Sequence, residues 1–232
     1  MPSAPNKTSI IDGLNGGLIA SCQPVANGAM DTDDMVVAMA QACEDGGATA
    51  VRIEGVTRVR KVAKAIKIPV VGIVKRDLSD SPVRITPYTT DVIELAAAGA
   101  QIIAVDATDR SRPTAVADLL ATIHQQGCLA MADCATHSDG VLAHAMGFDL
   151  IGTTLSGYTA ETACPDDAPF DAALIQSLTH AGCWVVAEGR IRNAAEAASA
   201  LQLGAKAVTV GSALTRLELM VAGYVGAVKA AQ

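Results

Sequence analysis

Eight short hydrophobic runs recur along the chain, and each is continuous rather than alternating between apolar and polar positions. They span residues 17–22, 48–55, 68–75, 100–107, 127–134, 148–155, 182–189 and 205–212. A continuous apolar run of this length is typical of a parallel strand that is covered on both faces. We therefore predict eight parallel strands.

Segments with a helical period lie between these runs and after the last one. We expect helices at residues 31–45, 56–66, 90–98, 113–126, 139–146, 171–180, 193–203 and 214–231. Pro113 suits the first turn of its helix, and Asp171 stands where helix-starting acids are found. Five of the helix-to-strand joins contain a Gly that predicts a C-cap, at 46–48, 98–100, 125–127, 181–183 and 203–205.

Eight alternations of strand and helix favour a (β/α)₈ barrel, the TIM-barrel fold. No linker or low-complexity tract interrupts them, so we predict one domain over residues 1–232. Residues 9–15 are expected to form a short helix that closes the barrel floor. The alternative is a doubly wound open sheet, which the lack of a GxGxxG motif after the first strand makes less favourable.

Composition narrows the classes of function. The chain is 50% hydrophobic and 18% charged, with a net charge of -7 and only 17 Lys and Arg residues, which argues against a nucleic-acid partner. It has no apolar run of 18 residues, and its first ten residues lack the build of a signal peptide, so we expect no membrane association. Six scattered cysteines without a CxxC pair indicate a reduced protein, expected in the cytoplasm.

Polar and ionisable residues gather where the predicted strands end, which in this barrel is the mouth that holds the active site. They are Gln23, Arg52, Glu54, Lys75, Asp106, Thr108, Asp133, Thr153, Thr154, Glu188, Arg190 and Ser212. One such group has about even odds of being part of a structural ion pair. Six or more converging ionisable groups are costly to desolvate without a ligand or pairing, so they indicate a functional site.

Two of these strand ends have the character of a phosphate site. The loops after strands seven and eight commonly hold phosphate in this fold. Gly189 and Gly211 would let backbone N–H groups approach the oxygens, Ser212 adds a hydroxyl, and Arg190 or Arg216 adds charge. The alternative is that both glycines only serve tight turns.

Lys75, Asp133 and Glu188 lie at the ends of strands three, five and seven, whose side chains can share one layer of the barrel. A lysine among Val and Ile residues tends toward a lowered pKa, which suits a base or a Schiff base. Glu188 would face Lys75 across the ligand. Two proton-transfer groups on opposite sides of one carbon can invert a stereocentre.

Seven segments together resemble the N-acetylmannosamine-6-phosphate 2-epimerase family. They are GGLIASCQP (16–24), VGIVKRD (71–77) with ITP (85–87), DATDRSRP (106–113), MADCAT (131–136), GFDLIGTTLSGYT (147–159), VVAEGRI (185–191) and VGSALTR (210–216). The resemblance implies interconversion of N-acetylmannosamine 6-phosphate and N-acetylglucosamine 6-phosphate in amino-sugar catabolism. It implies no organic cofactor, and we expect no metal. Departures are Glu54 in strand two, the loop at 23–34 and a last helix that lacks the usual proline after Thr215-Arg216.

The resemblance also implies roles for individual residues. Lys75 and Glu188 match the catalytic pair, and Asp133 matches an aspartate that we expect to orient Lys75. Gln23 and Arg52 match substrate-contacting positions, and Arg52 or a backbone N–H would stabilise the enolate oxygen. We add Thr153 as a further substrate-binding residue. The phosphate-binding positions are Gly189, Arg190, Gly211, Ser212 and Arg216.

Three other functions share part of this pattern. A Schiff-base lyase or aldolase would use Lys75 as its nucleophile, and a non-catalytic sugar-phosphate binding protein would keep only the phosphate loops. A ribulose-phosphate-type epimerase usually needs Asp, His and a metal, whereas the strand ends here offer Lys and Glu. The Ala- and Gly-rich last helix can pack on its own barrel or on a partner, which leaves a homodimer open.

Overall fold

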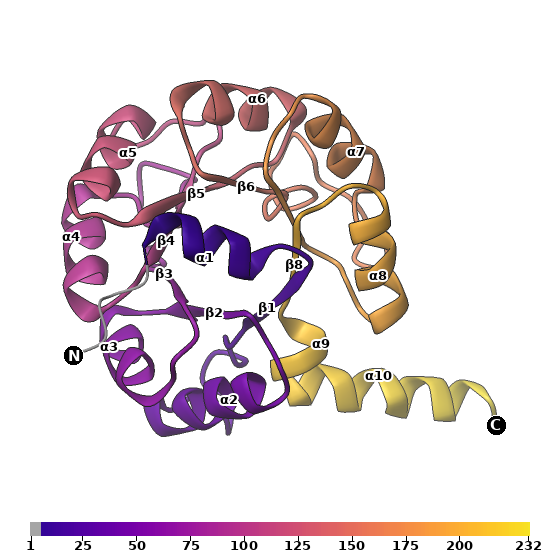
Figure 1. The fold of residues 1–232 in the computed structure, drawn as a ribbon. Helices are drawn as coiled ribbons and strands as arrows, with labels where there is room; N and C mark the ends of the chain where they lie inside the picture. The colour runs from indigo at the N-terminus through magenta and orange to yellow at the C-terminus, as the bar shows by residue number, and fades with distance from the viewer. Residues whose placement is uncertain (1–5) are drawn as a thin grey trace.

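Eight parallel strands pair in sequence order and close into a barrel in the computed structural model, which describes residues 6–232 (Figure 1). The strands are β1 (Gly17–Ser21), β2 (Ala50–Glu54), β3 (Val70–Ile73), β4 (Ile102–Asp106), β5 (Leu129–Asp133), β6 (Leu150–Gly152), β7 (Val185–Glu188) and β8 (Ala207–Val210). The barrel prediction is confirmed. The first five residues, which form half of the segment searched for a signal peptide, lie outside the described range.

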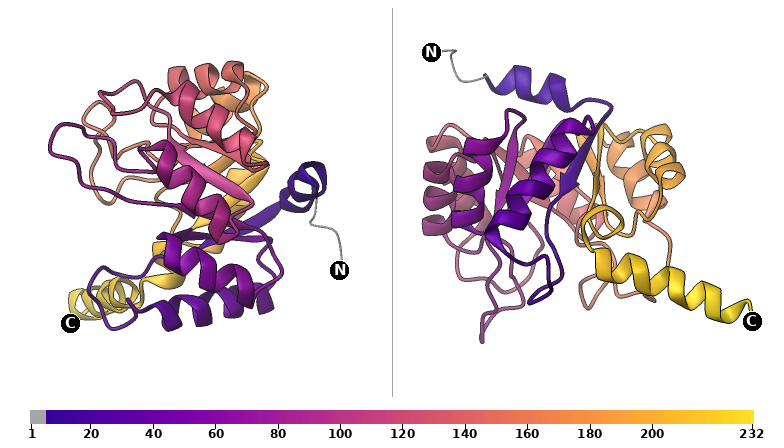
Figure 2. Two further views of the ribbon diagram at one scale, coloured as in Figure 1. Left: turned by 90° about the vertical axis from the view of Figure 1, so that its left-hand side faces the viewer. Right: turned by 90° about the horizontal axis from the view of Figure 1, so that it is seen from below.

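The helices are α1 (Lys7–Leu14), α2 (Asp33–Asp45), α3 (Val56–Ala65), α4 (Thr89–Ala98), α5 (Val116–Gln125), α6 (His137–Met146), α7 (Ala172–His180), α8 (Ala194–Gln202), α9 (Ser212–Thr215) and α10 (Leu217–Ala230). Helices α2 to α8 each follow a strand and cover the outside of the barrel, whereas α1, α9 and α10 lie at its ends (Figure 1 and Figure 2). Figure 1 shows α2 to α8 as an incomplete ring around the strands. None of the helices in residues 6–232 is both long and apolar enough to cross a membrane.

The N-terminal helix α1 closes the floor of the barrel, as expected. Ile10 and Leu14 pack into one buried cluster with inward-facing residues such as Ile19, Met131 and Val186. Figure 2 shows α1 at one end of the barrel, while α10 projects sideways from the other end. The polar mouth is therefore at the end of the barrel opposite α1.

Glycine ends most of the helices that return to the barrel. Gly47, Gly99, Gly127, Gly182 and Gly204 all have positive φ, between 77° and 105°. Residues with a Cβ rarely adopt this left-handed conformation, so these positions reverse the chain at little cost. The five predicted glycine caps are confirmed, and Gly147 is a sixth that the sequence analysis did not name.

Two predicted helix boundaries are wrong. Helix α5 begins at Val116, and Pro113 precedes it instead of occupying its first turn. The expected last helix is two helices, because the chain turns at Arg216 between α9 and α10. No residue of α10 is buried.

Candidate active site

A cavity of about 910 Å³ opens at the carboxyl ends of the strands. Its lining includes residues from β1, β2, β4, β7 and β8 and from the loops that follow the strands. Gln23, Arg52, Lys75, Glu188, Gly189, Arg190, Gly211, Ser212 and Arg216 are among its lining residues. Nine of the eleven residues proposed from the sequence thus come together in one place.

Lys75 enters this cavity from a position just beyond its strand. β3 ends at Ile73, and Lys75 lies two residues further on. Its Nζ donates to Oε1 of Gln23 at 2.6 Å, and Nε2 of Gln23 donates to Oγ of Ser21 at 2.8 Å. Burial lowers the pKa of the Lys75 ammonium, and the nearby charge of Arg52 lowers it further. A larger share of neutral amine suits proton transfer.

Arg52 forms a buried ionic network beneath the cavity. Its Nη2 lies 2.6 Å from Oδ2 of Asp133 and its Nη1 lies 3.1 Å from Oδ1, which is a bidentate pair. Nη1 also contacts Oε2 of Glu188 at 3.2 Å. The Arg52 and Asp133 side chains are almost fully buried, whereas 13% of the Glu188 side chain is exposed. The network presents Glu188 to the cavity.

The ionisation of Glu188 is set by opposing influences. Burial raises the pKa of its carboxyl group, and the charge of Arg52 acts in the other direction. Thr154 lies above the network, and its hydroxyl is 2.7 Å from Oδ1 of Asp133 and 3.2 Å from Oε2 of Glu188. The net shift is upward, so the protonated form of Glu188 reaches higher pH than that of an exposed glutamate.

The sequence predicts that Asp133 orients Lys75, but in the structure Asp133 has other partners. Its two carboxylate oxygens are paired with Arg52 and with the hydroxyl of Thr154. Gln23 is the side chain that hydrogen-bonds Lys75. The sequence predicts contacts among the side chains of β3, β5 and β7, whereas in the structure Arg52 from β2 lies between Asp133 and Glu188.

Thr153 lies between strands and outside the cavity lining. Its hydroxyl donates to the carbonyl of Glu188 at 2.8 Å and accepts from the Glu188 N–H at 3.0 Å, so it joins β6 to β7. Thr154 lines the cavity instead. The sequence could have predicted that Thr154 faces the cavity. Side chains alternate along a strand, and Leu150 of β6 faces the barrel interior, so Thr154, four residues later, points the same way.

The loops proposed for phosphate meet at one side of the cavity. Gly189 has φ of 104° and Arg190 has φ of 58°, and Gly211 precedes the short helix α9. Arg190 donates through Nε to the carbonyl of Pro169 at 2.9 Å and through Nη1 to that of Ser156. Arg190 thus also secures the loop after β6.

Arg216 completes that side of the cavity. Its Nε donates to the carbonyl of Gln23 at 3.1 Å, which links α9 to the end of β1. Gly211 approaches β1 closely, since a Cβ built on it would lie 3.3 Å from the Cβ of Ser21. Helix α9 begins at Ser212, at the rim of the cavity, and the N-terminus of a helix in general offers backbone N–H donors to an anion.

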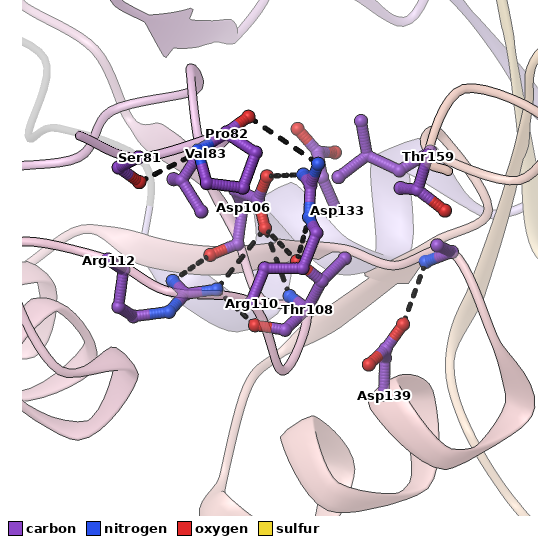
Figure 3. A network of polar contacts seen from close by, with 12 residues as sticks. Ser81, Pro82, Val83, Asp106, Thr108, Arg110, Arg112, Asp133, Asp139 and Thr159 are labelled. Atoms are coloured by element: carbon purple, nitrogen blue, oxygen red, sulfur yellow. Dashed lines mark hydrogen bonds and ion pairs between the residues drawn. The ribbon is translucent and has the colours of Figure 1, made fainter. Parts of the chain in front are cut away.

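The end of β4 contributes a network that the sequence analysis left without a role (Figure 3). Nη2 of Arg110 lies 2.5 Å from Oδ2 of the buried Asp106, and its Nε donates to Oγ1 of Thr108 at 2.8 Å. Arg112 donates to the backbone carbonyl of Asp106 at 2.7 Å. Asp106 and Arg110 both line the cavity. Within residues 6–232, no three His, Cys, Asp or Glu side chains are grouped as metal ligands would be.

Comparisons with known proteins agree on one family. Residues 36–230 match the NanE family model, described as "Putative N-acetylmannosamine-6-phosphate epimerase". A protein of Haemophilus ducreyi named "Putative N-acetylmannosamine-6-phosphate 2-epimerase" is 53% identical over 219 residues, which are 94% of each chain. One of the same name from Escherichia coli O9:H4 is 54% identical over 217 residues, which are 94% of this chain and 93% of that one.

A solved structure supports the same relationship. The N-acetylmannosamine-6-phosphate 2-epimerase from Clostridium perfringens superposes with a TM-score of 0.91 at 36% sequence identity. The match covers 97% of this chain and 99% of that one. The similarity therefore extends over the whole barrel.

Proposed function

The chain belongs to the N-acetylmannosamine-6-phosphate epimerase family, and on this premise we propose how its cavity performs the reaction. The protein is an isomerase that interconverts N-acetylmannosamine 6-phosphate and N-acetylglucosamine 6-phosphate. The two sugars differ only at C2. The reaction therefore removes the C2 proton and returns a proton to the opposite face.

Ring opening makes that proton removable. The open-chain sugar has an aldehyde at C1, so the C2 hydrogen is acidic and its loss gives an enolate. We assign the two proton transfers to Lys75 and Glu188, which line one cavity and approach it from β3 and β7. Burial lowers the pKa of Lys75 and raises that of Glu188, which brings the pKa values of the proton donor and acceptor closer together. This shared cavity is the observation on which the assignment rests.

Arg52 and Asp133 keep Glu188 in place in this scheme. A carboxylate hydrogen-bonded by Arg52 and Thr154 has a fixed orientation toward the sugar. Arg52 also brings positive charge close to the enolate oxygen, which stabilises the intermediate. Gln23 fixes the amine of Lys75 and can hydrogen-bond the sugar as well.

We place the phosphate at the loops after β7 and β8. Gly189, Gly211, Ser212 and Arg216 line the cavity there. In this proposal the glycine N–H groups and the Ser212 hydroxyl bind the phosphate oxygens, and Arg216 adds positive charge. Arg190 acts there chiefly by holding the surrounding loop. This position leaves the rest of the sugar to extend toward Lys75 and Glu188.

A proton NMR time course with N-acetylmannosamine 6-phosphate tests the proposed function. Wild-type protein should produce the gluco epimer, and Lys75→Ala and Glu188→Ala should each abolish turnover while remaining folded. Substantial residual turnover in either variant would contradict the two-group scheme. Borohydride reduction in the presence of substrate should trap nothing on Lys75, whereas a covalent adduct would indicate the Schiff-base alternative.

We also propose that the protein is a homodimer formed through α10. This helix exposes Leu217, Val221, Val225 and Val228, and a lone 14-residue helix is marginally stable in water. An apolar groove of about 460 Å³ between α8 and the barrel offers a complementary surface on a second copy. We expect the protein in the cytoplasm, in keeping with its six free cysteines.

A further inference from the structure

The backbone around Lys75 is held by a single returning segment. β3 has ended at Ile73, so Lys75 lacks the ladder that fixes the strand residues. It forms instead an isolated antiparallel bridge with Ile85, and the N–H of Arg76 donates to the carbonyl of Arg84 at 2.9 Å. The loop between them therefore folds back along Lys75.

Thr86 closes this loop through two hydrogen bonds to one residue. Its backbone N–H donates to the carbonyl of Val74 at 2.7 Å, and its Oγ1 accepts from the Val74 N–H at 3.2 Å. Thr86 is fully buried and Val74 is nearly so. Both backbone groups of the residue that immediately precedes Lys75 are thus satisfied by one threonine.

The conformation of Thr86 is unusual for its residue type. Its φ is 47°, in the left-handed region, where β-branched residues are rare outliers. Strained backbone of this kind persists only when its surroundings fix it, and it is concentrated at functional sites. A buried, strained threonine next to the proposed catalytic lysine meets that description.

The end of β4 supplies the surroundings that fix the loop. The Ile85 carbonyl, next to Thr86, accepts from the Asp106 N–H at 3.1 Å. Further along the loop, the Pro82 carbonyl accepts from Nη1 of Arg110 at 3.4 Å, a contact drawn in Figure 3. Arg110 is in turn anchored by the carboxylate of Asp106.

We propose that Thr86 is a positioning residue for Lys75. By holding Val74 through its N–H and its hydroxyl, it directs the lysine side chain into the cavity, where Nζ reaches Gln23 at 2.6 Å. The proposal rests on the proposed function, in which Lys75 transfers a proton. Thr86 itself needs no contact with the substrate.

Displacement of Lys75 would change its ionisation as well as its reach. Its amine is influenced by the charges of Arg52, Glu54, Arg84 and Arg216, and its own charge acts to lower the pKa of Glu188. Burial is the largest reason that its pKa is low. A lysine released toward water regains solvation of the ammonium form, so its pKa rises.

Thr86→Val and Thr86→Ser separate the hydroxyl from the shape of the side chain. Valine removes the acceptor for the Val74 N–H, whereas serine keeps it. We expect kcat of Thr86→Val to fall about 10- to 100-fold, as slight misplacement of a catalytic group does, with KM little changed. The alkaline limb of its pH profile should move to higher pH. Thr86→Ser should restore both properties, and Thr86→Gly should behave like Thr86→Val if the valine variant does not fold.

Ile123→Ala serves as the matched control. Ile123 is buried on α5 in the layer between helices and strands, away from the cavity lining. It should lose stability but keep the wild-type kcat and pH profile. Wild-type kcat and alkaline limb in Thr86→Val, or equal losses in the valine and serine variants, would overturn the proposal.

A direct titration separates this proposal from the proposed function. Heteronuclear NMR of ¹³C-lysine-labelled protein follows the Lys75 signal, identified by its absence in Lys75→Met. The pKa of Lys75 should be higher in Thr86→Val than in wild type, and an unchanged value would overturn the positioning role. Wild-type protein that shows no epimerisation would instead overturn the proposed function, whatever the titration shows.

Discussion

Lys75 and Glu188 occupy one cavity, and burial moves their pKa values toward each other. At a pH between these two pKa values, Glu188 and Lys75 together hold one proton. The protein should be active over the same pH range whether Lys75 or Glu188 is the base, because in either case the two residues together must hold one proton. The pH dependence therefore tests the pair without assigning the direction.

We predict a bell-shaped profile of kcat against pH. Activity should rise as Glu188 loses its proton, above the ordinary glutamate value of about 4.3, since its pKa is raised. It should fall as Lys75 loses its proton, below the ordinary lysine value of about 10.4, since its pKa is lowered. Steady-state rates across pH measure both limbs. Limbs at the ordinary values would contradict the buried pair.

Arg52→Met tests the ionic network beneath the cavity. The variant leaves Asp133 and Glu188 without their cation, and breaking a buried pair in this way costs about 3–5 kcal/mol of unfolding free energy. The loss should shrink as pH falls, because protonation removes the unpaired charges. Urea unfolding at neutral and acidic pH measures the difference.

Arg58→Met is the control for that experiment. Arg58 on α3 pairs with Asp31 and Asp33 at a partly exposed site. Such pairs contribute about 0–1 kcal/mol, so the control should change little at either pH. Equal losses in the two variants would contradict the account of the network.

For individual residues, the sequence predicts which side chains reach the mouth of the barrel better than it predicts which of them contact one another. Lys75, Glu188 and Arg52 follow from where the apolar runs end, because all parallel strands deliver their ends to one mouth. The partners of Asp133 do not follow, since they depend on how far Arg52 reaches across the barrel. Thr86 was missed because its left-handed φ leaves no mark in the residue pattern.

At the scale of the elements, backbone conformation decides what a glycine contributes. Gly127 after α5 has φ of 77°, whereas Gly13 lies inside α1, and a Cβ on either would meet nothing within 4 Å. Gly127→Ala should destabilise by about 1–2 kcal/mol because alanine resists the left-handed region. Gly13→Ala should stabilise by about 1 kcal/mol through its better helix propensity.

Thermal or urea unfolding of the two variants tests this contrast. Neither site places an atom in the way of an added Cβ. Changes of opposite sign in the free energy of unfolding would therefore show that backbone conformation causes the difference. Two changes of the same sign would contradict that explanation.

The alternation of strands and helices is predictable because its signal is repeated eight times. Continuous apolar runs and glycine caps locate each element within a few residues. The exceptions are local: Pro113 precedes α5, and Arg216 separates α9 from α10. The Arg216 side chain donates to the Gln23 carbonyl at the mouth, and a contact between residues this distant in sequence leaves no mark in the local pattern.

At the scale of the whole molecule, α10 is the feature that the barrel does not explain. Val225 and Val228 are exposed by 44% and 61% on a helix that projects from the domain (Figure 2). We predict that light scattering gives twice the 23.6 kDa mass of one chain. Val225→Asp with Val228→Asp should yield monomers, since charge is costly in an apolar interface.

Lys229→Asp is the control for this prediction. Lys229 is an exposed charged residue in the last turn of α10. Its replacement by another charged residue leaves the apolar surface of the helix unchanged. It should leave the mass unchanged. A wild-type mass of one chain would contradict the proposed homodimer.

We propose that Lys75 and Glu188 move a proton at C2 of the sugar. Proton NMR of N-acetylmannosamine 6-phosphate with the protein in D₂O tests it most directly. We predict that the gluco epimer appears with deuterium at C2 and that neither Lys75→Ala nor Glu188→Ala supports its formation. Epimer that keeps its original hydrogen at C2, or no epimer and no exchange from folded wild-type protein, would contradict it.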